Sequence, residues 1–343
     1  MARQSDTIRV AGAGLAGLCA ALRLARHGFD VEIVEAKKRI APSSGPHTEA
    51  LRSYADEDIL ADLRRNGFDM EPFAAVQKTI RKSVHFQNAL HGPAYFLYMR
   101  GRGPETVDQL LYRRCLDSGV RFRFGVGEGN AGPFNIVATG PPPNKVNMIG
   151  AGFTFSAEGS NLDSQTVYAL LDNEVAPGGY LVITPGLGFH SIYSVSWREL
   201  RYDVLARLTE SALHLPWVQE ILGSSRRIDK IFGKAYYSPD PIRTSERDGV
   251  LYVGEAGGFQ DAIAGFGFRY AVLTASFAAE SIVDGTNYRD LLQKRFGREF
   301  EYAFAVRQKL DSFTNFDFDR LVESLGPETT LDEYQKRRHS GIF

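Results

Sequence analysis

The chain opens with a hydrophobic pattern that is typical of a strand, a helix and a second strand. Residues 7–11 form a short β-branched and apolar run, and residues 15–27 carry apolar side chains at helical spacing. Gly28 follows, and residues 31–35 then alternate as a half-buried strand does. This order predicts a compact βαβ unit with parallel strands.

The rest of the chain divides into helical segments and a strand-rich middle. Helical spacing predicts helices over residues 49–65, 104–117 and 266–283 and from 288 to the C-terminus. β-prone segments predict strands within 84–99, at 120–124, 134–138 and 249–254, and through most of 146–183, 191–197 and 228–237. No fixed-period repeat is visible.

Composition removes several functional classes. Hydrophobic residues make up 43% and charged residues 24% of the 343, which predicts a packed core and roughly two domains. Lys and Arg number 40 against 41 Asp and Glu, so no basic excess favours nucleic acid. The two cysteines and the absence of an apolar leader predict a reducing, cytoplasmic location. No apolar window reaches the roughly 18 residues of a transmembrane helix, which leaves peripheral membrane contact open.

A glycine-rich turn joins the first strand to the first helix. Gly12, Gly14 and Gly17 match G-x-G-x-x-G, and Glu35 ends the next strand, 18 residues after Gly17. The glycines permit a tight turn, close approach of a pyrophosphate and packing of helix on strand. The N–H groups of the helix start attract phosphates, and Glu35 would accept hydrogen bonds from a ribose. The motif therefore predicts a dinucleotide site.

Residues 127–132 fit the same glycine pattern only in letters. Pro133 and the strand predicted at 134–138 follow them, so no helix start is available to hold a phosphate. We therefore predict a loop here, and no second dinucleotide site for NAD(P)H.

A far glycine-rich segment favours FAD over NAD alone. Glu255 follows the strand predicted at 249–254, and Gly265 and Gly267 precede the next predicted helix. This segment provides a carboxylate for a ribose or ribityl hydroxyl and a second positive helix end. That end would lie at the flavin pyrimidine ring, where negative charge develops on reduction.

These motifs resemble those of the FAD-dependent oxidoreductases with the p-hydroxybenzoate hydroxylase fold, and among them the geranylgeranyl reductase family. Residues 252–259 and 265–268 are similar to the family's V-G-D-A-A-G-F and G-x-G-I, with Glu255 in place of Asp. Residues 136–140 resemble the flavoprotein strand that ends in A-T-G. Residues 177–185 resemble the reductases' P-G-G-Y-x-W-x-F-P without its Trp and Phe, and the halogenase pattern W-x-W-x-I-P is absent.

The resemblance implies an α/β fold in which a Rossmann-like FAD-binding domain is built from discontinuous segments. We assign residues 1–75, 100–145 and 240–285 to it, residues 76–99 and 146–239 to an inserted β-sheet substrate domain, and 286–343 to C-terminal helices. Arg102 is similar to the family's arginine near the flavin chain or pyrophosphate. The expected cofactor contacts are Gly12, Gly14, Leu15, Ala16, Gly17, Glu35, Ala36, Arg102, Val126, Glu255, Gly265, Phe266, Gly267 and Phe268.

Few catalytic side chains are required, because a flavin carries the reaction itself. Candidates for proton transfer on the inserted sheet are Tyr180, His190, Tyr193 and Tyr236, each of which has the alternative of an ordinary place among sheet side chains. The histidines and cysteines show no metal-ligand spacing, so no metal is expected.

The expected function is FAD-dependent oxidoreduction of an apolar organic substrate, isoprenoid or aromatic. The resemblance favours hydride transfer to a C=C bond, with electrons from an external donor such as NAD(P)H or a redox protein. Two alternatives stay open: a flavin-dependent monooxygenase, and a flavin-binding protein without turnover.

Overall fold

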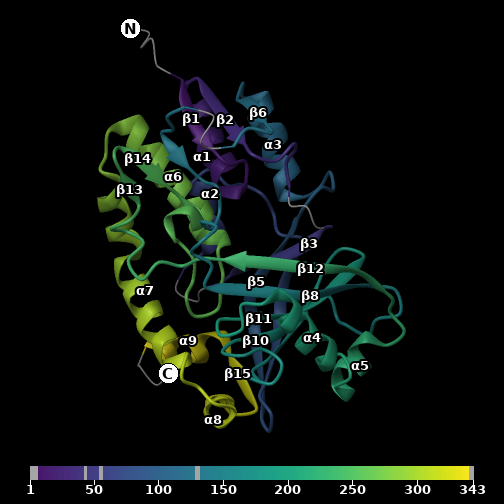
Figure 1. The fold of residues 1–343 in the computed structure, drawn as a ribbon. Helices are drawn as coiled ribbons and strands as arrows, with labels where there is room; N and C mark the ends of the chain where they lie inside the picture. The colour runs from purple at the N-terminus through teal and green to yellow at the C-terminus, as the bar shows by residue number, and fades with distance from the viewer. Residues whose placement is uncertain (1–6, 42–44, 54–56, 128–131, 340–343) are drawn as a thin grey trace.

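Two β-sheets organise the computed structural model, which describes residues 7–41, 45–53, 57–127 and 132–339. The first sheet has the strand order β13-β14-β7-β1-β2-β6 (Figure 1). Its strands are β1 (Ile8–Ala11), β2 (Val31–Glu35), β6 (Arg121–Phe124), β7 (Ile136–Val137), β13 (Glu246–Arg247) and β14 (Val250–Tyr252). All neighbours except β13 and β14 pair in parallel, so the start, the middle and the 250–252 segment of the chain share one sheet.

Helices cover this first sheet and form its core. They are α1 (Leu15–Arg26), α2 (Ile59–Arg65), α3 (Val107–Asp117) and α6 (Phe268–Asp284). The strand–turn–helix order predicted from residue 7 onwards is therefore present. α1 packs against both α3 and α6, because small and apolar side chains such as Ala20, Ala21 and Leu24 face inward along it.

The second sheet is larger and mostly antiparallel. Its order is β12-β8-β11-β10-β9-β4-β5-β15, and β3 also pairs with β5. Its strands are β3 (His47–Arg52), β4 (Ala74–Lys82), β5 (Gln87–Arg100), β8 (Met148–Ser156), β9 (Thr166–Leu170), β10 (Tyr180–Pro185), β11 (Phe189–Ser196), β12 (Arg227–Ala235) and β15 (Glu328–Thr330). On one face, α4 (Tyr202–Ala212) and α5 (Pro216–Leu222) cover a core that includes Phe153, Leu181 and Ile192.

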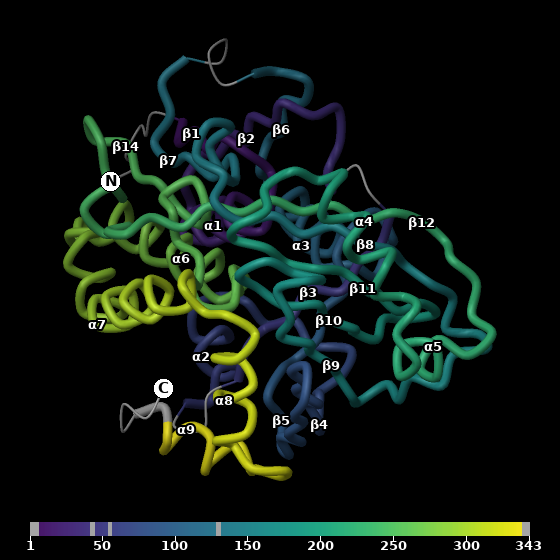
Figure 2. The backbone as a smooth tube through the Cα atoms, turned by 60° about the horizontal axis from the view of Figure 1, so that its bottom comes forward, coloured from purple at the N-terminus to yellow at the C-terminus, as the bar shows by residue number. Residues whose placement is uncertain are grey.

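The C-terminal part joins the two sheets. It consists of α7 (Tyr288–Leu310), α8 (Asn315–Leu325), β15 and α9 (Leu331–His339). Figure 2 shows this part running from the helices of the first sheet to the second sheet, where β15 pairs with β5 at the sheet edge. A capping box between Thr314 and Asp317 fixes the start of α8. No helix of the described residues is long and apolar enough to cross a membrane.

The single helix predicted over residues 49–65 is wrong in its first half. Residues 47–52 form β3, which pairs with β5 from His47↔Arg100 to Arg52↔Tyr95, and only residues 59–65 are helical. Residues 54–56 lie outside the described residues. The apolar spacing suited a helix, but the long β5 offers β3 a full ladder of hydrogen bonds that local periodicity does not reveal. β15 likewise adds a strand to the segment predicted to be helical.

Candidate cofactor and substrate cavities

The glycine turn before α1 has the shape that a dinucleotide requires. Gly12 has φ +95°, and a Cβ there would lie 2.5 Å from the carbonyl oxygen of Ala138. A Cβ on Gly17 would lie 2.0 Å from the carbonyl oxygen of Gly12, so helix and strand pack closely. A Cβ on Gly14 would meet nothing within 4 Å, because this residue borders a cavity. The free N–H groups of the α1 start are therefore open to a ligand.

Glu35 fixes the same turn from the end of β2. One carboxylate oxygen accepts a 2.8 Å hydrogen bond from the Ala13 N–H, and the other accepts one of 2.8 Å from the Lys37 N–H. Glu35 also lines the cavity, and each oxygen has a further lone pair for a hydroxyl. The predicted contact with a ribose stays a prediction.

The two glycine-rich segments line one cavity of about 410 Å³, which we call the cofactor cavity. A Cβ on Gly254 would lie 3.2 Å from the Cβ of Ala16, so the far segment lies directly beside α1. Gly267, at the start of α6, lines the cavity opposite the first turn. Two helix starts and an open glycine face therefore meet in one space, and these groups fit FAD.

A buried charge cluster borders the cofactor cavity. Arg100, the last residue of β5, donates hydrogen bonds of 2.9 and 2.8 Å to Asp108 and a further one to Glu49. Burial opposes ionisation of Asp108, but the Arg100 guanidinium and its hydrogen bonds hold the pKa of that carboxyl below its usual value. Arg100 lines the cavity, whereas the predicted Arg102 is exposed and does not. Nothing in the sequence indicates that Arg100, and not Arg102, is the arginine that lines the cavity.

A central cavity of about 330 Å³ continues from the cofactor cavity and shares part of its lining. The shared residues are His47, Glu49, Lys234, Glu255 and Gly267. The tyrosines Tyr180 and Tyr193 of the second sheet also face this space.

Two of the residues shared by these cavities, Glu255 and His47, have pKa values that differ from their ordinary ones. Burial raises the pKa of Glu255 to about 8, and the nearby Glu49 adds to the rise. Burial lowers the pKa of His47, and the Arg100 charge lowers it further. The junction of the two cavities therefore favours a protonated carboxyl and a neutral imidazole at neutral pH.

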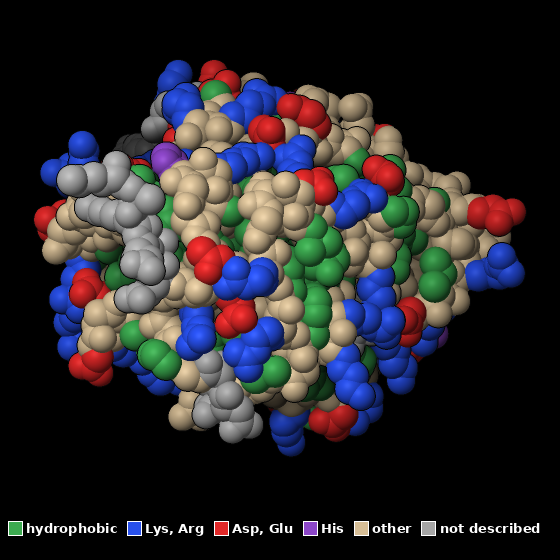
Figure 3. All heavy atoms as spheres, turned by 90° about the horizontal axis from the view of Figure 1, so that it is seen from above, with side chains coloured by type: hydrophobic (Ala, Val, Ile, Leu, Met, Phe, Trp, Pro, Cys, Tyr) green, Lys and Arg blue, Asp and Glu red, His purple; other side chains and the backbone are tan. Residues whose placement is uncertain are grey.

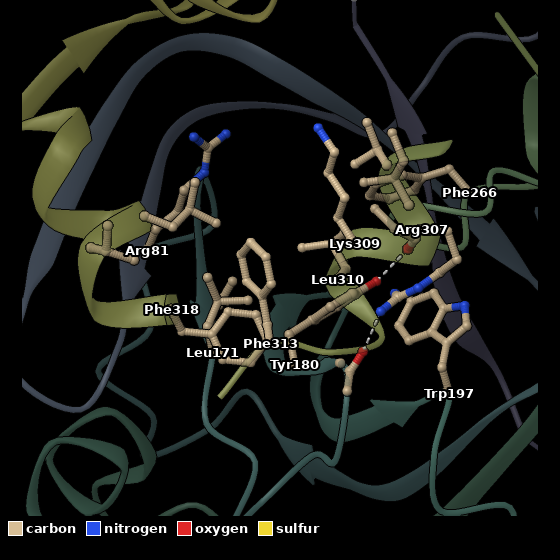
Figure 4. Close-up of a pocket in the computed structure, with 18 of the residues that line it drawn as sticks. Arg81, Leu171, Tyr180, Trp197, Phe266, Arg307, Lys309, Leu310, Phe313 and Phe318 are labelled. Carbon is tan, nitrogen blue, oxygen red and sulfur yellow. Dashed lines mark hydrogen bonds between the residues drawn. The ribbon is translucent and has the colours of Figure 1, made fainter. Parts of the chain in front are cut away.

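A third cavity of about 240 Å³ lies between the second sheet and the C-terminal helices, and we call it the outer cavity (Figure 4). It shares Tyr180 and Phe266 with the central cavity. The Tyr180 hydroxyl donates a 2.6 Å hydrogen bond to the carbonyl oxygen of Ala264, which fixes this side chain at the junction. Most other lining side chains are apolar, among them Leu171, Leu310, Phe313, Phe318, Val322 and Leu325.

Three of the four proposed proton-transfer residues lie on strands of the second sheet and divide between its two faces, whereas Tyr236 follows the end of β12. Tyr180 and Tyr193 face the central cavity. His190 does not, because strand alternation points it to the opposite face, where it is buried and stacked on Phe155 with ring centres 5.8 Å apart. Burial there lowers the pKa of His190 to about 4. Tyr236 does not line any of the three cavities.

The remaining expected cofactor residues are also divided. Leu15 and Ala16 line the cofactor cavity, and Gly265 and Phe266 line the central one. Phe268 is buried in the core and stacks on Tyr98, so only its backbone at the α6 start is available to a ligand. Ala36 and Val126 do not line these cavities; the Val126 N–H instead donates a 3.2 Å hydrogen bond to the Glu35 carbonyl oxygen.

The second stretch that fits the glycine pattern does not begin a helix in its described part. Residues 128–131 lie outside the described residues. Gly132 is followed by β7 after an irregular segment, and Gly127 is exposed and lines none of the three cavities.

Comparisons with known proteins agree with this geometry. Residues 10–54 match the family described as NAD(P)-binding Rossmann-like domain. The chain is 22% identical to the digeranylgeranylglycerophospholipid reductase of Methanosarcina acetivorans, over 93% of this chain and 88% of that protein. It is 23% identical to digeranylgeranylglycerophospholipid reductase 2 of Methanopyrus kandleri, over 94% and 91%.

Solved structures show the same fold over nearly the whole chain. A geranylgeranyl bacteriochlorophyll reductase-like protein of Thermoplasma acidophilum superposes with a TM-score of 0.76 at 16% identity, over 96% of this chain and 94% of that one. The flavin-dependent halogenase CmlS superposes with a TM-score of 0.62 at 14% identity, over 98% and 72%. Together with the two helix starts that meet in the cofactor cavity, these findings identify the chain as an FAD-dependent oxidoreductase with the fold of the geranylgeranyl reductase-like flavoproteins.

Proposed function

We propose that the protein reduces C=C bonds of an isoprenoid lipid with electrons from bound FAD. The observation that carries this proposal is a series of three cavities in which each neighbouring pair shares lining residues. It begins at the glycine turn, passes Tyr193 and Tyr180, and ends between the apolar side chains of α7 and α8. A long apolar substrate fits such a path. A small polar substrate would leave the apolar outer cavity unfilled.

The residues of the cofactor cavity have separate roles in holding FAD. The N–H groups at the start of α1 attract the pyrophosphate, and Gly14 leaves room for its approach. The start of α6 would offer a positive helix end to the flavin ring system. The chemistry that FAD would supply there, when bound and reduced, is transfer of a hydride to an acceptor carbon.

Reduction of a C=C bond also needs a proton, and Tyr193 is placed to donate it. Burial raises the pKa of Tyr193 to about 12, and the charge of Glu49 adds to the rise, so the phenol is protonated at neutral pH. Tyr180 is less available, because its hydroxyl already donates to Ala264. We infer that Tyr193 donates its proton in the central cavity and recovers one from solvent.

The sequence relatives support the substrate class. Those reported above are named as reductases of a digeranylgeranyl glycerophospholipid, and they align with nearly the full chain. The shared fold of flavin-dependent halogenases and oxygenases is the observation that keeps a monooxygenase as the second candidate.

The test begins with the visible spectrum of the purified protein, in which we expect flavin absorbance that is released on denaturation. The protein is then reduced without oxygen, by dithionite or by NADH, NADPH or a ferredoxin, and mixed with a geranylgeranyl lipid. We expect reoxidation of the flavin and a product that mass spectrometry shows to contain two more hydrogens per reduced bond. Substrate-dependent oxygen consumption with a hydroxylated product would instead establish the monooxygenase.

Replacement of the proposed donor tests the proton step. Tyr193→Phe keeps the ring but removes the hydroxyl, so we expect kcat to fall about 10²-fold or more while flavin content stays unchanged. Tyr236→Phe, which alters a hydroxyl outside the three cavities, is the matched control. Equal activity of wild type and Tyr193→Phe would exclude Tyr193 as the donor.

A further inference from the structure

Every charged side chain that lines the outer cavity is a cation. The lining includes Arg52, Arg81, Arg307 and Lys309, and no Asp or Glu among the described residues. This is unusual in a chain with a net charge of −1. An apolar cavity with charge of one sign at its wall selects a ligand that combines an apolar body with the opposite charge.

Two of the four cations already have carboxylate partners. Nη1 of Arg52 lies 3.7 Å from Oδ2 of Asp261, and Nε of Arg307 lies 2.8 Å from Oδ1 of Asp311. Arg307 also donates a 3.1 Å hydrogen bond to the carbonyl oxygen of Gly178 and lies over the Trp197 ring. These contacts hold both arginines in the wall and satisfy much of their charge.

The other two cations have no carboxylate partner within the described part of the chain. Arg81 of β4 places its guanidinium 4.0 Å from the ring centre of Tyr334, which fixes its plane without neutralising it. Lys309, near the end of α7, is exposed to solvent. Figure 4 shows the charged ends of Arg81 and Lys309 on the same side of the cavity, away from Trp197.

We propose that Arg81 and Lys309 form a headgroup site that holds the phosphate of an amphiphilic substrate while its isoprenoid chain fills the outer and central cavities. This inference rests on the proposed function and adds the two residues that determine headgroup specificity. A planar guanidinium gives a phosphate paired hydrogen bonds, and the ammonium adds a mobile point charge. The isoprenoid chain of the ligand then extends past Tyr180 into the central cavity. The distance from the headgroup site to the central cavity thus determines which double bond of the ligand reaches that cavity.

Binding of ligands that have no C=C bond tests this site separately from catalysis. The probes are a fully saturated twenty-carbon isoprenoid alcohol, its phosphate monoester, a saturated diether glycerophosphate and inorganic phosphate. Each is titrated into the full-length holoprotein, and tryptophan fluorescence reports binding because Trp197 lines the cavity. We expect at least one phosphate amphiphile to bind about tenfold or more tightly than the alcohol. The tighter of the two identifies the headgroup source.

Single charge removals then assign the effect to residues. We expect Arg81→Gln and Lys309→Gln each to weaken binding of the phosphate amphiphile about tenfold and to leave binding of the alcohol unchanged. Lys82→Gln is the matched control for β4, because Lys82 is the next residue on the same strand and does not line the cavity. Lys294→Gln is the control for α7, about four turns before Lys309.

Three outcomes would overturn the headgroup site. The alcohol binds as tightly as the phosphates, the variants weaken both ligands equally, or inorganic phosphate alone competes as well as the amphiphiles. Any of these results leaves C=C reduction untouched, since that reaction is measured by product mass. Conversely, a protein without reductase activity that still prefers phosphate amphiphiles through Arg81 and Lys309 would refute only the proposed reaction.

Discussion

At the scale of single residues, the cofactor cavity depends on glycines that have different reasons for lacking a side chain. Gly12 and Gly17 have no room for a Cβ inside the fold, whereas Gly14 has room inside the fold and faces the cavity. Substitutions at these positions should therefore separate folding from cofactor binding.

We expect Gly14→Val to fold and to lose FAD. Its side chain would project into the cofactor cavity and block the pyrophosphate, so the purified protein should lack flavin absorbance and show a circular dichroism spectrum like that of wild type. Gly127→Val is the control, because Gly127 lies in the second glycine stretch, also has no atom of the described residues within 4 Å of a Cβ and lines none of the three cavities. Full flavin content in Gly14→Val would contradict the assignment of the pyrophosphate to this turn.

Glu255 should make the stability of the flavin-free protein depend on pH. Burial raises its pKa to about 8 in the folded state from an ordinary value of 4.5, so the folded protein binds one more proton than the unfolded chain between these values. The contribution of Glu255 to the free energy of unfolding is therefore greatest below about pH 4.5 and is lost as the pH rises through 8.

We expect the Tm of the apoprotein to fall between pH 5 and pH 8 and Glu255→Gln to flatten this decline. Differential scanning fluorimetry at fixed ionic strength measures both proteins. Glu105→Gln, at an exposed carboxylate, is the control and should follow wild type. A Glu255→Gln profile as steep as that of wild type would show that other groups cause the dependence.

The predicted cofactor residues that line the cofactor cavity are those whose position follows from the local backbone, and their contacts with a cofactor stay predictions. Gly14, Glu35 and Gly267 lie where their motifs predicted, because a turn, a strand end and a helix start define positions within a few residues. Arg100 and Lys234 were missed, since each reaches the cavity through pairing in the second sheet. His190 was misplaced because its face depends on the register of β11, and sequence alone does not decide which face of this strand is buried against α4 and α5.

At the scale of elements, an ion-pair network joins α2, α6 and α7. Arg269 of α6 donates hydrogen bonds of 3.0 Å to Glu299 of α7 and to Glu57, just before α2. Glu57 also pairs with Arg295 of α7. Arg269 is buried. Its loss would leave the half-buried carboxylates of Glu57 and Glu299 without the positive charge that stabilises them.

We expect Arg269→Gln to lower the free energy of unfolding by about 2–4 kcal/mol, which is less than the roughly 3–5 kcal/mol for a fully buried pair because both glutamates keep some contact with solvent. Urea denaturation measures the change. Arg207→Gln removes an exposed pair with Asp203 on α4 and should cost less than about 0.5 kcal/mol. Similar losses in both variants would show that the network does not hold α7 in place.

Element prediction succeeded where a segment carries its own signals and failed where a partner strand decides. The helix predicted over residues 104–117 is present as α3, which ends at the predicted position before Ser118 and Gly119. β3 and β15 have no such signal, and both are fixed by β5, which lies about 40 residues after β3 and more than 200 before β15.

At the scale of the whole molecule, the face in Figure 3 carries side chains of both charges. On the face in Figure 3, basic and acidic side chains alternate around a region of polar and hydrophobic surface. We expect specificity to depend on the three cavities in the interior, whose linings join elements from both sheets and from the C-terminal helices.

Narrowing the outer end of this path should select against long substrates. Leu310 ends α7 and lines the outer cavity but not the central one, so we expect Leu310→Trp to lower kcat/KM about tenfold for a twenty-carbon isoprenoid and less than about twofold for a ten-carbon one. Leu200→Trp, at an exposed position outside the cavities, is the control. Equal losses for both chain lengths would place the substrate elsewhere.

The strand order of the first sheet also governs when the protein can mature during synthesis. β1 lies between β2 and β7. The other edge of β7 pairs with β14, which is synthesised more than a hundred residues later. A nascent chain that has left the ribosome only as far as the second sheet thus exposes an unpaired edge, with half of its nucleotide pocket missing. Because the lining of the cofactor cavity extends to Ala271, a bound cofactor reaches its full set of contacts, and its full stabilisation of the fold, only after this residue has emerged.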